Sequence, residues 1–270
     1  RCFRSGPYGQ CPKEKKGRPR PGGGIVKRPG GAGRQSTERR GYCDMTMKEA
    51  MEARHTVRKY LDKPIPEEVL QKLRERMDAL NAEFGLDIRL RVGDPEALSG
   101  VYRLLGKNVK NYFILAGRPA PDLQERLGYC AADLMLYAQT LGLNTWIIGG
   151  TYNKKAVARH AEGLEVAGIV AVGYGATQGV PHRSRRPEMV SDYEGPEPPW
   201  FLEGVRAALL APTSLNRQKF FVKGRGNEVS IRYKNGACAG VNLGLVKYHF
   251  ELGAGKGSFN WPRTKKKVQV

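Results

Sequence analysis

The sequence predicts an α+β fold, and three observations lead to this expectation. Of the 270 residues, 40% are hydrophobic and 9% aromatic, which suffices for a sizeable core and excludes a wholly disordered chain. Helical and strand-like segments follow one another in a mostly non-alternating order, unlike the regular alternation of parallel α/β folds. The longest apolar stretches, such as residues 166–174, are far shorter than the roughly 18–20 residues that cross a bilayer, and no N-terminal signal pattern is found. We therefore expect a soluble, cytoplasmic protein.

The predicted elements begin with two helices. Residues 47–55 form a short one, and the next begins near Pro66, where Pro followed by Glu suits a helix N-terminus. Its apolar residues recur at helical spacing, at Val69, Leu73, Met77 and Leu80. The later elements are strands at 88–92 and 112–116, a helix at 127–141 ended by Gly142, strands at 146–148 and 166–174, a helix at 201–210, a hairpin of 220–222 and 229–233, and a helix at 240–252.

Two parts of this pattern share one layout. Residues 67–92 and residues 200–223 both follow the order helix, turn, strand. Either the chain contains two pseudo-repeats, or the likeness is a coincidence, because helix-turn-strand units are common.

The positive charge is concentrated at the chain ends. The net charge is +20, and residues 1–44 contribute twelve basic and three acidic side chains in a Gly/Pro-rich stretch without helical or strand periodicity. We predict a disordered basic tail there and a second, short one at residues 263–270. The first tail is either an arm for nucleic acid or anionic lipid or upstream sequence that the native protein does not carry, since the chain begins with Arg and its first methionines are Met45 and Met47.

Cysteines and glycines give no strong motif. The five cysteines form no CxxC pair and no zinc-spaced cluster with histidine, so we predict reduced thiols, no metal site, and Cys130 and Cys238 as small buried residues. The glycine-rich segments at 173–175 and 253–258 resemble nucleotide-binding loops, but arginines follow the first where a helix is required, and no strand precedes the second.

Residues 54–60, here called the arginine motif, have a more specific composition. Arg54, His55, Thr56 and Arg58 place three basic side chains and a hydroxyl within five residues at the end of a predicted helix. Such groups suit a phosphate monoester, which accepts hydrogen bonds from several directions. A solvated basic helix end is the alternative.

The arginine motif, with residues 62–66, resembles the N-terminal signature of the FMN-dependent nitroreductase family. Residues 212–220, here called the amide motif, resemble its second signature. Residues 141–150 look like its central helix-to-strand loop, and residues 173–174 with 183–187 are similar to its late strand and basic loop. In common members the second signature comes one helix after the first, whereas here about 150 residues intervene. This is similar to the nitroreductase subgroup in which one chain resembles a fused dimer.

The resemblance implies a nitroreductase-like fold over residues 45–262, with a mainly antiparallel central sheet flanked by helices, and one FMN site. Arg54, His55, Thr56 and Arg58 would hold the FMN phosphate and ribityl chain, with Arg183 and Arg185 adding positive charge. Pro212, Thr213, Ser214, Asn216 and Gln218 would line the isoalloxazine edge, and the backbone amides of Gly149 and Gly150 would reach flavin N5. No catalytic side chain is implied, because the flavin carries the chemistry.

The implied activity is an FMN-dependent oxidoreductase. Hydride would pass from NAD(P)H through flavin N5 to an electron-poor small molecule such as a nitroaromatic or quinone. Two alternatives stay open: a binding module that keeps the fold without redox turnover, and a nucleic-acid binder that acts through the basic tail. The resemblance also implies either a monomer that acts as a pseudo-dimer or a homodimer, with no membrane partner.

Overall fold

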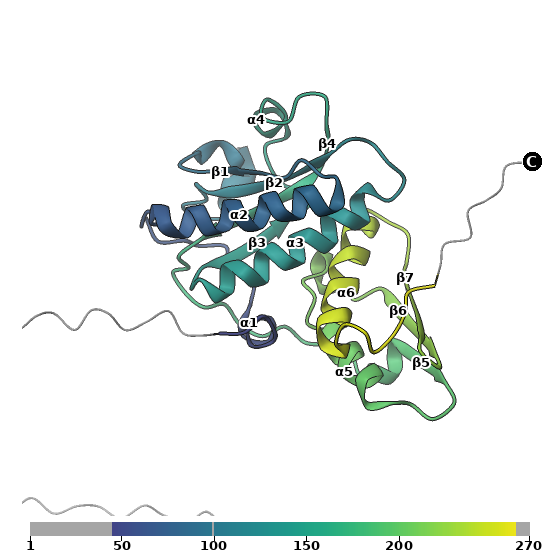
Figure 1. Cartoon of the computed structure of the whole chain (residues 1–270). Helices are drawn as coiled ribbons and strands as arrows, with labels where there is room; N and C mark the ends of the chain where they lie inside the picture. The colour runs from purple at the N-terminus through teal and green to yellow at the C-terminus, as the bar shows by residue number, and fades with distance from the viewer. Residues whose placement is uncertain (1–44, 99, 263–270) are drawn as a thin grey trace, which may run out of the picture. The chain divides into compact units, whose positions relative to one another are not determined.

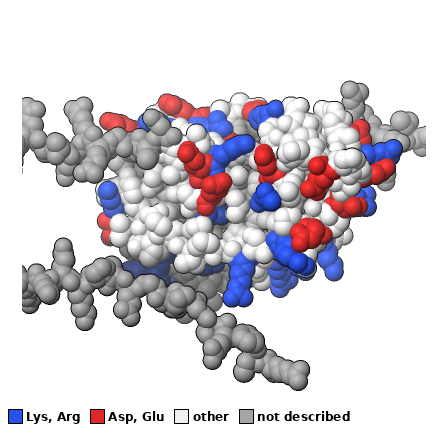
Figure 2. All heavy atoms as spheres, turned by 90° about the horizontal axis from the view of Figure 1, so that it is seen from below, with Lys and Arg blue, Asp and Glu red and all other residues white. Residues whose placement is uncertain are grey.

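The computed structural model describes residues 45–98 and 100–262. The two predicted basic tails lie outside the described residues. Among the described residues, every helix is too short or too polar to span a membrane. Basic and acidic side chains are interspersed over much of the face that Figure 2 shows.

A four-stranded antiparallel sheet forms the first part of the fold. Its strands lie in the order β1 (Arg89–Arg91), β2 (Tyr112–Gly117), β4 (Glu165–Gly173) and β3 (Asn144–Ile148). The helices α2 (Glu67–Phe84) and α3 (Leu123–Thr140) pack against one face, which Figure 1 shows. The short helix α4 (Lys154–Ala158) and the 3₁₀ helices η1 (Pro95–Ala97) and η2 (Gly100–Leu105) belong to the opposite side. All four strands coincide, within a few residues at their ends, with the strands that the sequence predicted.

A smaller three-stranded sheet and two helices form the second part. Strand β5 (Ser191–Glu194) pairs in parallel with β6 (Phe220–Arg225), which forms the predicted antiparallel hairpin with β7 (Glu228–Tyr233). Helices α5 (Pro199–Ala208) and α6 (Ala239–Ala254) pack against each other. The connections contain two short 3₁₀ helices, η3 (Pro187–Met189) and η4 (Ser214–Asn216). The four-stranded sheet is the mainly antiparallel sheet flanked by helices that the sequence predicted, and the three-stranded sheet is a second, smaller one.

The first helix is shorter than expected. α1 (Met47–Ala53) begins at a capping box, in which Thr46 and Glu49 satisfy each other's backbone N–H groups. It ends two residues before the predicted end, because Arg54 has φ −73° and ψ 120°, an extended conformation. The arginine motif therefore leaves the helix at once and continues as extended chain.

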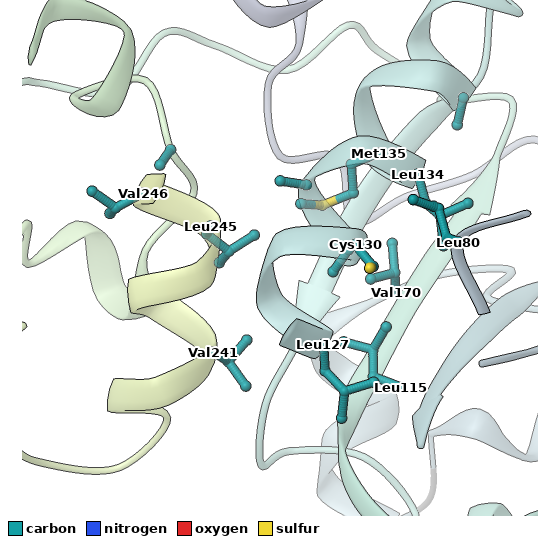
Figure 3. Close-up of a cluster of buried hydrophobic side chains, with 14 of the residues drawn as sticks. Leu80, Leu115, Leu127, Cys130, Leu134, Met135, Val170, Val241, Leu245 and Val246 are labelled. Carbon is teal, nitrogen blue, oxygen red and sulfur yellow. The ribbon is translucent and has the colours of Figure 1, made fainter. Parts of the chain in front are cut away.

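The two parts of the fold meet where α3 crosses α6. A Cβ atom on Gly128 would overlap the backbone of Val241, and one on Gly244 would overlap the backbone of Glu125. Each glycine thus contacts the residue three positions before the glycine of the other helix, which is the reciprocity of a two-fold interface. In Figure 3, Val241 and Leu245 of α6 point toward α3. The crossing supports the pseudo-repeat interpretation of the sequence.

Candidate functional site

The arginine motif runs beside strand β3 as an added extended segment. Thr56 forms a parallel bridge with Thr145, whose carbonyl oxygen accepts from the Val57 N–H at 3.1 Å. The N–H of Tyr60 donates to the carbonyl of Lys107 at 3.0 Å. These backbone bonds on both sides hold the motif rigidly against the first sheet, so its side chains have defined positions.

Arg54 is the most unusual residue of the motif. It is only 4% exposed, and its Nε and Nη1 atoms are buried without a hydrogen-bond partner. Burial lowers the pKa of its guanidinium to about 10, so the group stays charged at neutral pH. No carboxylate among the described residues forms an ion pair with it. A buried charge without a counter-ion is costly, and an anionic ligand would remove that cost.

The loop of residues 174–186 crosses the end of the arginine motif. A side chain on Gly179, whose φ is +75°, would meet the Cβ atom of His55 at 2.8 Å, so the two backbones approach closely. Burial, the charge of Arg54 and the proximity of His182 together lower the pKa of His55. His182 in turn hydrogen-bonds through Nε2 to the carbonyl of Leu209 at 2.9 Å. The loop therefore connects the arginine motif to the end of α5.

The amide motif folds into a strained turn after α5. Leu215, Asn216 and Gln218 have φ angles of 53°, 50° and 47°, although none of them is glycine. Side-chain-bearing residues seldom adopt such angles, and backbone strain of this kind concentrates at functional sites. Ser214 is tied to α6, because its backbone N–H donates to Asn242 Oδ1 at 3.0 Å. The strained turn is thus held from outside the motif.

The amide motif also positions the loop that carries the predicted arginines. Gln218 Oε1 accepts from the backbone N–H of Arg185 at 2.8 Å, and Asn216 Nδ2 donates to the carbonyl of Arg183 at 2.7 Å. The two arginine side chains are exposed. Both amides are thus engaged with the chain itself, and their contact with a flavin ring stays a prediction.

The glycine pair after β3 lies beside Cys238. A Cβ atom on Gly149 would be 2.5 Å from Cys238 Sγ, whereas Gly150 faces open space. Cys238 is partly exposed, with φ 60° at the start of α6, which corrects the prediction that it is buried. Burial raises the pKa of Tyr233, which interacts with both Thr213 and Cys238. Gly149 therefore lies beside Cys238, while Cys130 is buried as predicted.

The remaining predicted residues lie at the margin of this cluster. Arg58 is exposed, and its guanidinium stacks over the ring of Trp146 at 5.5 Å. Pro212 is partly buried and Thr213 buried, where the Thr213 hydroxyl accepts from the Gln218 N–H at 3.2 Å. Arg58 thus flanks the site from the first sheet, and the Thr213 hydroxyl holds the amide motif from within.

Sequence reasoning missed two histidines near Arg54. His249 of α6 is fully buried, and burial, aided by the charge of Arg54 and by His182, lowers its pKa to about 3. In the sequence, His249 stands at the helical spacing of an apolar stretch, which indicates an ordinary core residue. His182 stands among loop residues without a pattern. Only the tertiary structure brings both to the buried arginine.

Comparison with known proteins identifies the family. Residues 46–254 match the family described as "Putative TM nitroreductase". A nitroreductase structure from Thermotoga maritima msb8 has a TM-score of 0.59 at 20% identity, covering 83% of this chain and 88% of that chain. A nitroreductase from Desulfovibrio desulfuricans, solved in complex with FMN, has a TM-score of 0.46 at 17% identity, covering 56% of this chain and 98% of that one. Comparison with curated proteins gave no match. The likeness to the Thermotoga structure shows a shared nitroreductase-like α+β fold.

Proposed function

Since this chain belongs to the nitroreductase family, we propose that it is an FMN-dependent oxidoreductase. The proposed reaction takes hydride from NAD(P)H and delivers it to an electron-poor small molecule such as a nitroaromatic or a quinone. One observation carries the proposal: Arg54 is buried and charged, and its Nε and Nη1 atoms have no hydrogen-bond partner among the described residues.

The chemistry of the site fits a phosphate monoester. Such a group carries close to two negative charges at neutral pH and has acceptor oxygens in several directions. Arg54, His55 and Thr56 would contribute donors from the first part of the fold, and the exposed Arg183 and Arg185 would add positive charge from the loop. The absence of a carboxylate partner for Arg54 among the described residues leaves its charge available to this anion.

The second half of the site would meet the flavin ring. The backbone amides of Gly149 and Gly150 are proposed to face flavin N5, because residues without a Cβ atom permit close approach. Pro212, Thr213 and Ser214 would lie along the ring edge, and Asn216 and Gln218 would hold the loop of the two arginines in place. FMN itself supplies the hydride chemistry, so this chain needs only to bind, orient and shield it.

One observation favours a second candidate, a nitroreductase-fold binding module without redox turnover. The amides of Asn216 and Gln218, predicted to contact the ring, already hydrogen-bond to the chain. A ring held with fewer polar contacts would still bind, but without donors beside the positions where negative charge develops it would be a poor hydride acceptor.

The test is spectroscopic. The protein is expressed with added FMN, purified, and mixed anaerobically with NADH or NADPH while the flavin absorbance is followed. A yellow protein whose flavin band bleaches supports the oxidoreductase. A yellow protein that never bleaches supports the binding module. Protein that stays colourless and does not bind added FMN overturns both. Arg54→Met should lose the flavin, and Arg76→Met, which replaces an arginine away from the site, is the matched control and should keep it.

A further inference from the structure

The buried ring of His249 offers an acceptor next to the buried donors of Arg54. We infer that His249 is a positioning residue: its Nε2 atom accepts from a water molecule held by the Arg54 guanidinium, and this bridge orients the guanidinium toward a bound phosphate monoester. The inference rests on the proposed function and assigns a task to a residue that the flavin chemistry does not otherwise use.

The tautomer of His249 follows from its hydrogen bonds. Nδ1 lies 2.8 Å from the carbonyl oxygen of Leu245, one helical turn earlier on α6. A carbonyl only accepts, so Nδ1 carries the proton. The ring is fully buried and stays neutral at pH 7. Nε2 must then present a lone pair, and this atom has no partner among the described residues.

Arg54 presents the complementary groups. A guanidinium has five N–H donors and no acceptor, and those on Nε and Nη1 are buried without partners. α1, which Arg54 ends, packs against α6, which carries His249, and the charge of Arg54 lowers the pKa of the His249 ring. One of these buried groups lacks an acceptor and the other lacks a donor, and no direct hydrogen bond joins them. One bridging water molecule would satisfy both.

A neutral acceptor suits this position better than a carboxylate. A carboxylate would orient the guanidinium but also neutralise it, and so weaken its attraction for an anion. Neutral histidine fixes the direction of the donors and leaves the full charge for the ligand. The charged or titratable side chains that influence the pKa of this ring are Arg54 and His182, and the phenol ring of Tyr248 lies edge-on to it at 6.2 Å. None of the three is a carboxylate.

The test compares two flavins that differ only in the phosphate. Dissociation constants for FMN and riboflavin are measured by fluorescence titration with wild-type protein, His249→Leu and His249→Gln. His249→Leu should weaken FMN about 10-fold, the scale of one hydrogen bond to a charged group, and riboflavin less than about 2-fold. His249→Gln, whose side-chain oxygen replaces Nε2, should restore FMN affinity to within about 3-fold of wild type. In the Arg54→Met background, His249→Leu should add no further loss.

Other outcomes separate the two proposals. Equal weakening of both flavins by His249→Leu, or a full loss that persists without Arg54, overturns the positioning role while the flavin function stands. Wild-type protein that binds no FMN overturns the proposed function instead. If His249→Leu does not fold, the ring ¹⁵N shifts of wild-type protein decide: an unprotonated Nε2 whose signal moves on FMN addition is expected, and a protonated Nε2 overturns the inference.

Discussion

Arg54 and Arg76 lie in contrasting surroundings, although both adjoin the paired helices α3 and α6. Arg76 binds Asp133 through two hydrogen bonds of 2.6 and 2.5 Å, and Tyr248 adds a third bond to the same carboxylate at 2.8 Å. Arg54 is more deeply buried, and within the described part of the chain its Nε and Nη1 atoms have no hydrogen-bond partner. Arg76 thus has its own carboxylate, whereas no described carboxylate neutralises Arg54, as the proposed anion site requires.

The helix crossing makes this comparison sharper. Asp133 and His249 each lie five positions after the glycine at which their helix meets the other. At corresponding positions, α3 therefore offers a carboxylate to its arginine and α6 a neutral ring. Arg76 also lines a cavity of about 330 Å³ between α2, α3 and α6. The charge of Arg76 in this cavity is already neutralised by Asp133, so its guanidinium is not available to a phosphate as that of Arg54 is.

The largest expected effect separates the two arginines. Arg54→Met should weaken FMN binding by at least about 100-fold, because several charge-assisted hydrogen bonds are lost, and leave the apo protein at least as stable, because a buried unpaired charge is removed. Arg76→Met should leave FMN binding unchanged and lower the free energy of unfolding by about 2 kcal/mol, since Asp133 stays buried without its partner and the Arg76 side chain is 42% exposed. Flavin titration and urea unfolding of both variants measure these effects. Weaker FMN binding in Arg76→Met than in Arg54→Met would contradict the assignment of ligand binding to Arg54.

A second substitution gives α6 a carboxylate at the position that corresponds to Asp133 of α3. His249→Asp places a carboxylate near Arg54, so the internal ion pair should compete with the ligand phosphate and weaken FMN about 30-fold, a scale set by one close opposite charge. His249→Asn, which is similar in size but neutral, is the control and should lose far less. FMN affinity that is the same in both variants would show that the absence of a carboxylate beside Arg54 is not what keeps the site open.

A third pair of substitutions tests the correspondence of the helices. Gly128→Ala and Gly244→Ala should each destabilise the protein by about 2 kcal/mol, because a Cβ atom would overlap the backbone of the other helix. Glycine to alanine in a free helix has the opposite sign, a gain of up to about 1 kcal/mol. Since both residues belong to one crossing, the double variant should cost less than the sum. If urea unfolding shows that either variant is more stable than wild type, the reciprocal contact between the two helices is contradicted.

Much of the fold could be predicted because its signals are local. The apolar residues of α2 and α3 recur at helical spacing, and β2 is a continuous apolar run, as its complete burial explains. Strand β5 and helix α4 escaped prediction, because SDYE is a short polar edge strand and KKAVA spans little more than one turn. Neither segment is long enough to show a period.

For the candidate site, the sequence predicted the motifs but not the surroundings of their side chains. The arginine motif was recognised from charge and spacing, but its residues say nothing of whether a carboxylate faces Arg54 in the fold. His249 was missed because a histidine in an apolar helix is indistinguishable in sequence from a core residue. The partners of Asn216 and Gln218 depend on positive φ angles that their residue types do not indicate. The sequence alone does not show which buried polar groups find hydrogen-bond partners in the folded chain.

The last prediction concerns the pH dependence of stability and follows from the same histidine. In the unfolded chain His249 takes up a proton near pH 6.5, the ordinary histidine value, whereas in the folded protein it does so only near pH 3, because burial and the charge of Arg54 disfavour the cation. Between these values the unfolded state binds more protons, so stability falls as the pH is lowered, by about 1.4 kcal/mol per unit. His249→Gln should remove this slope, and subtracting its unfolding free energies from those of wild type cancels the carboxylates that titrate in the same range. Parallel curves would mean that the ring is protonated in the folded protein, and a protonated Nε2 could not accept the bridging hydrogen bond that orients Arg54.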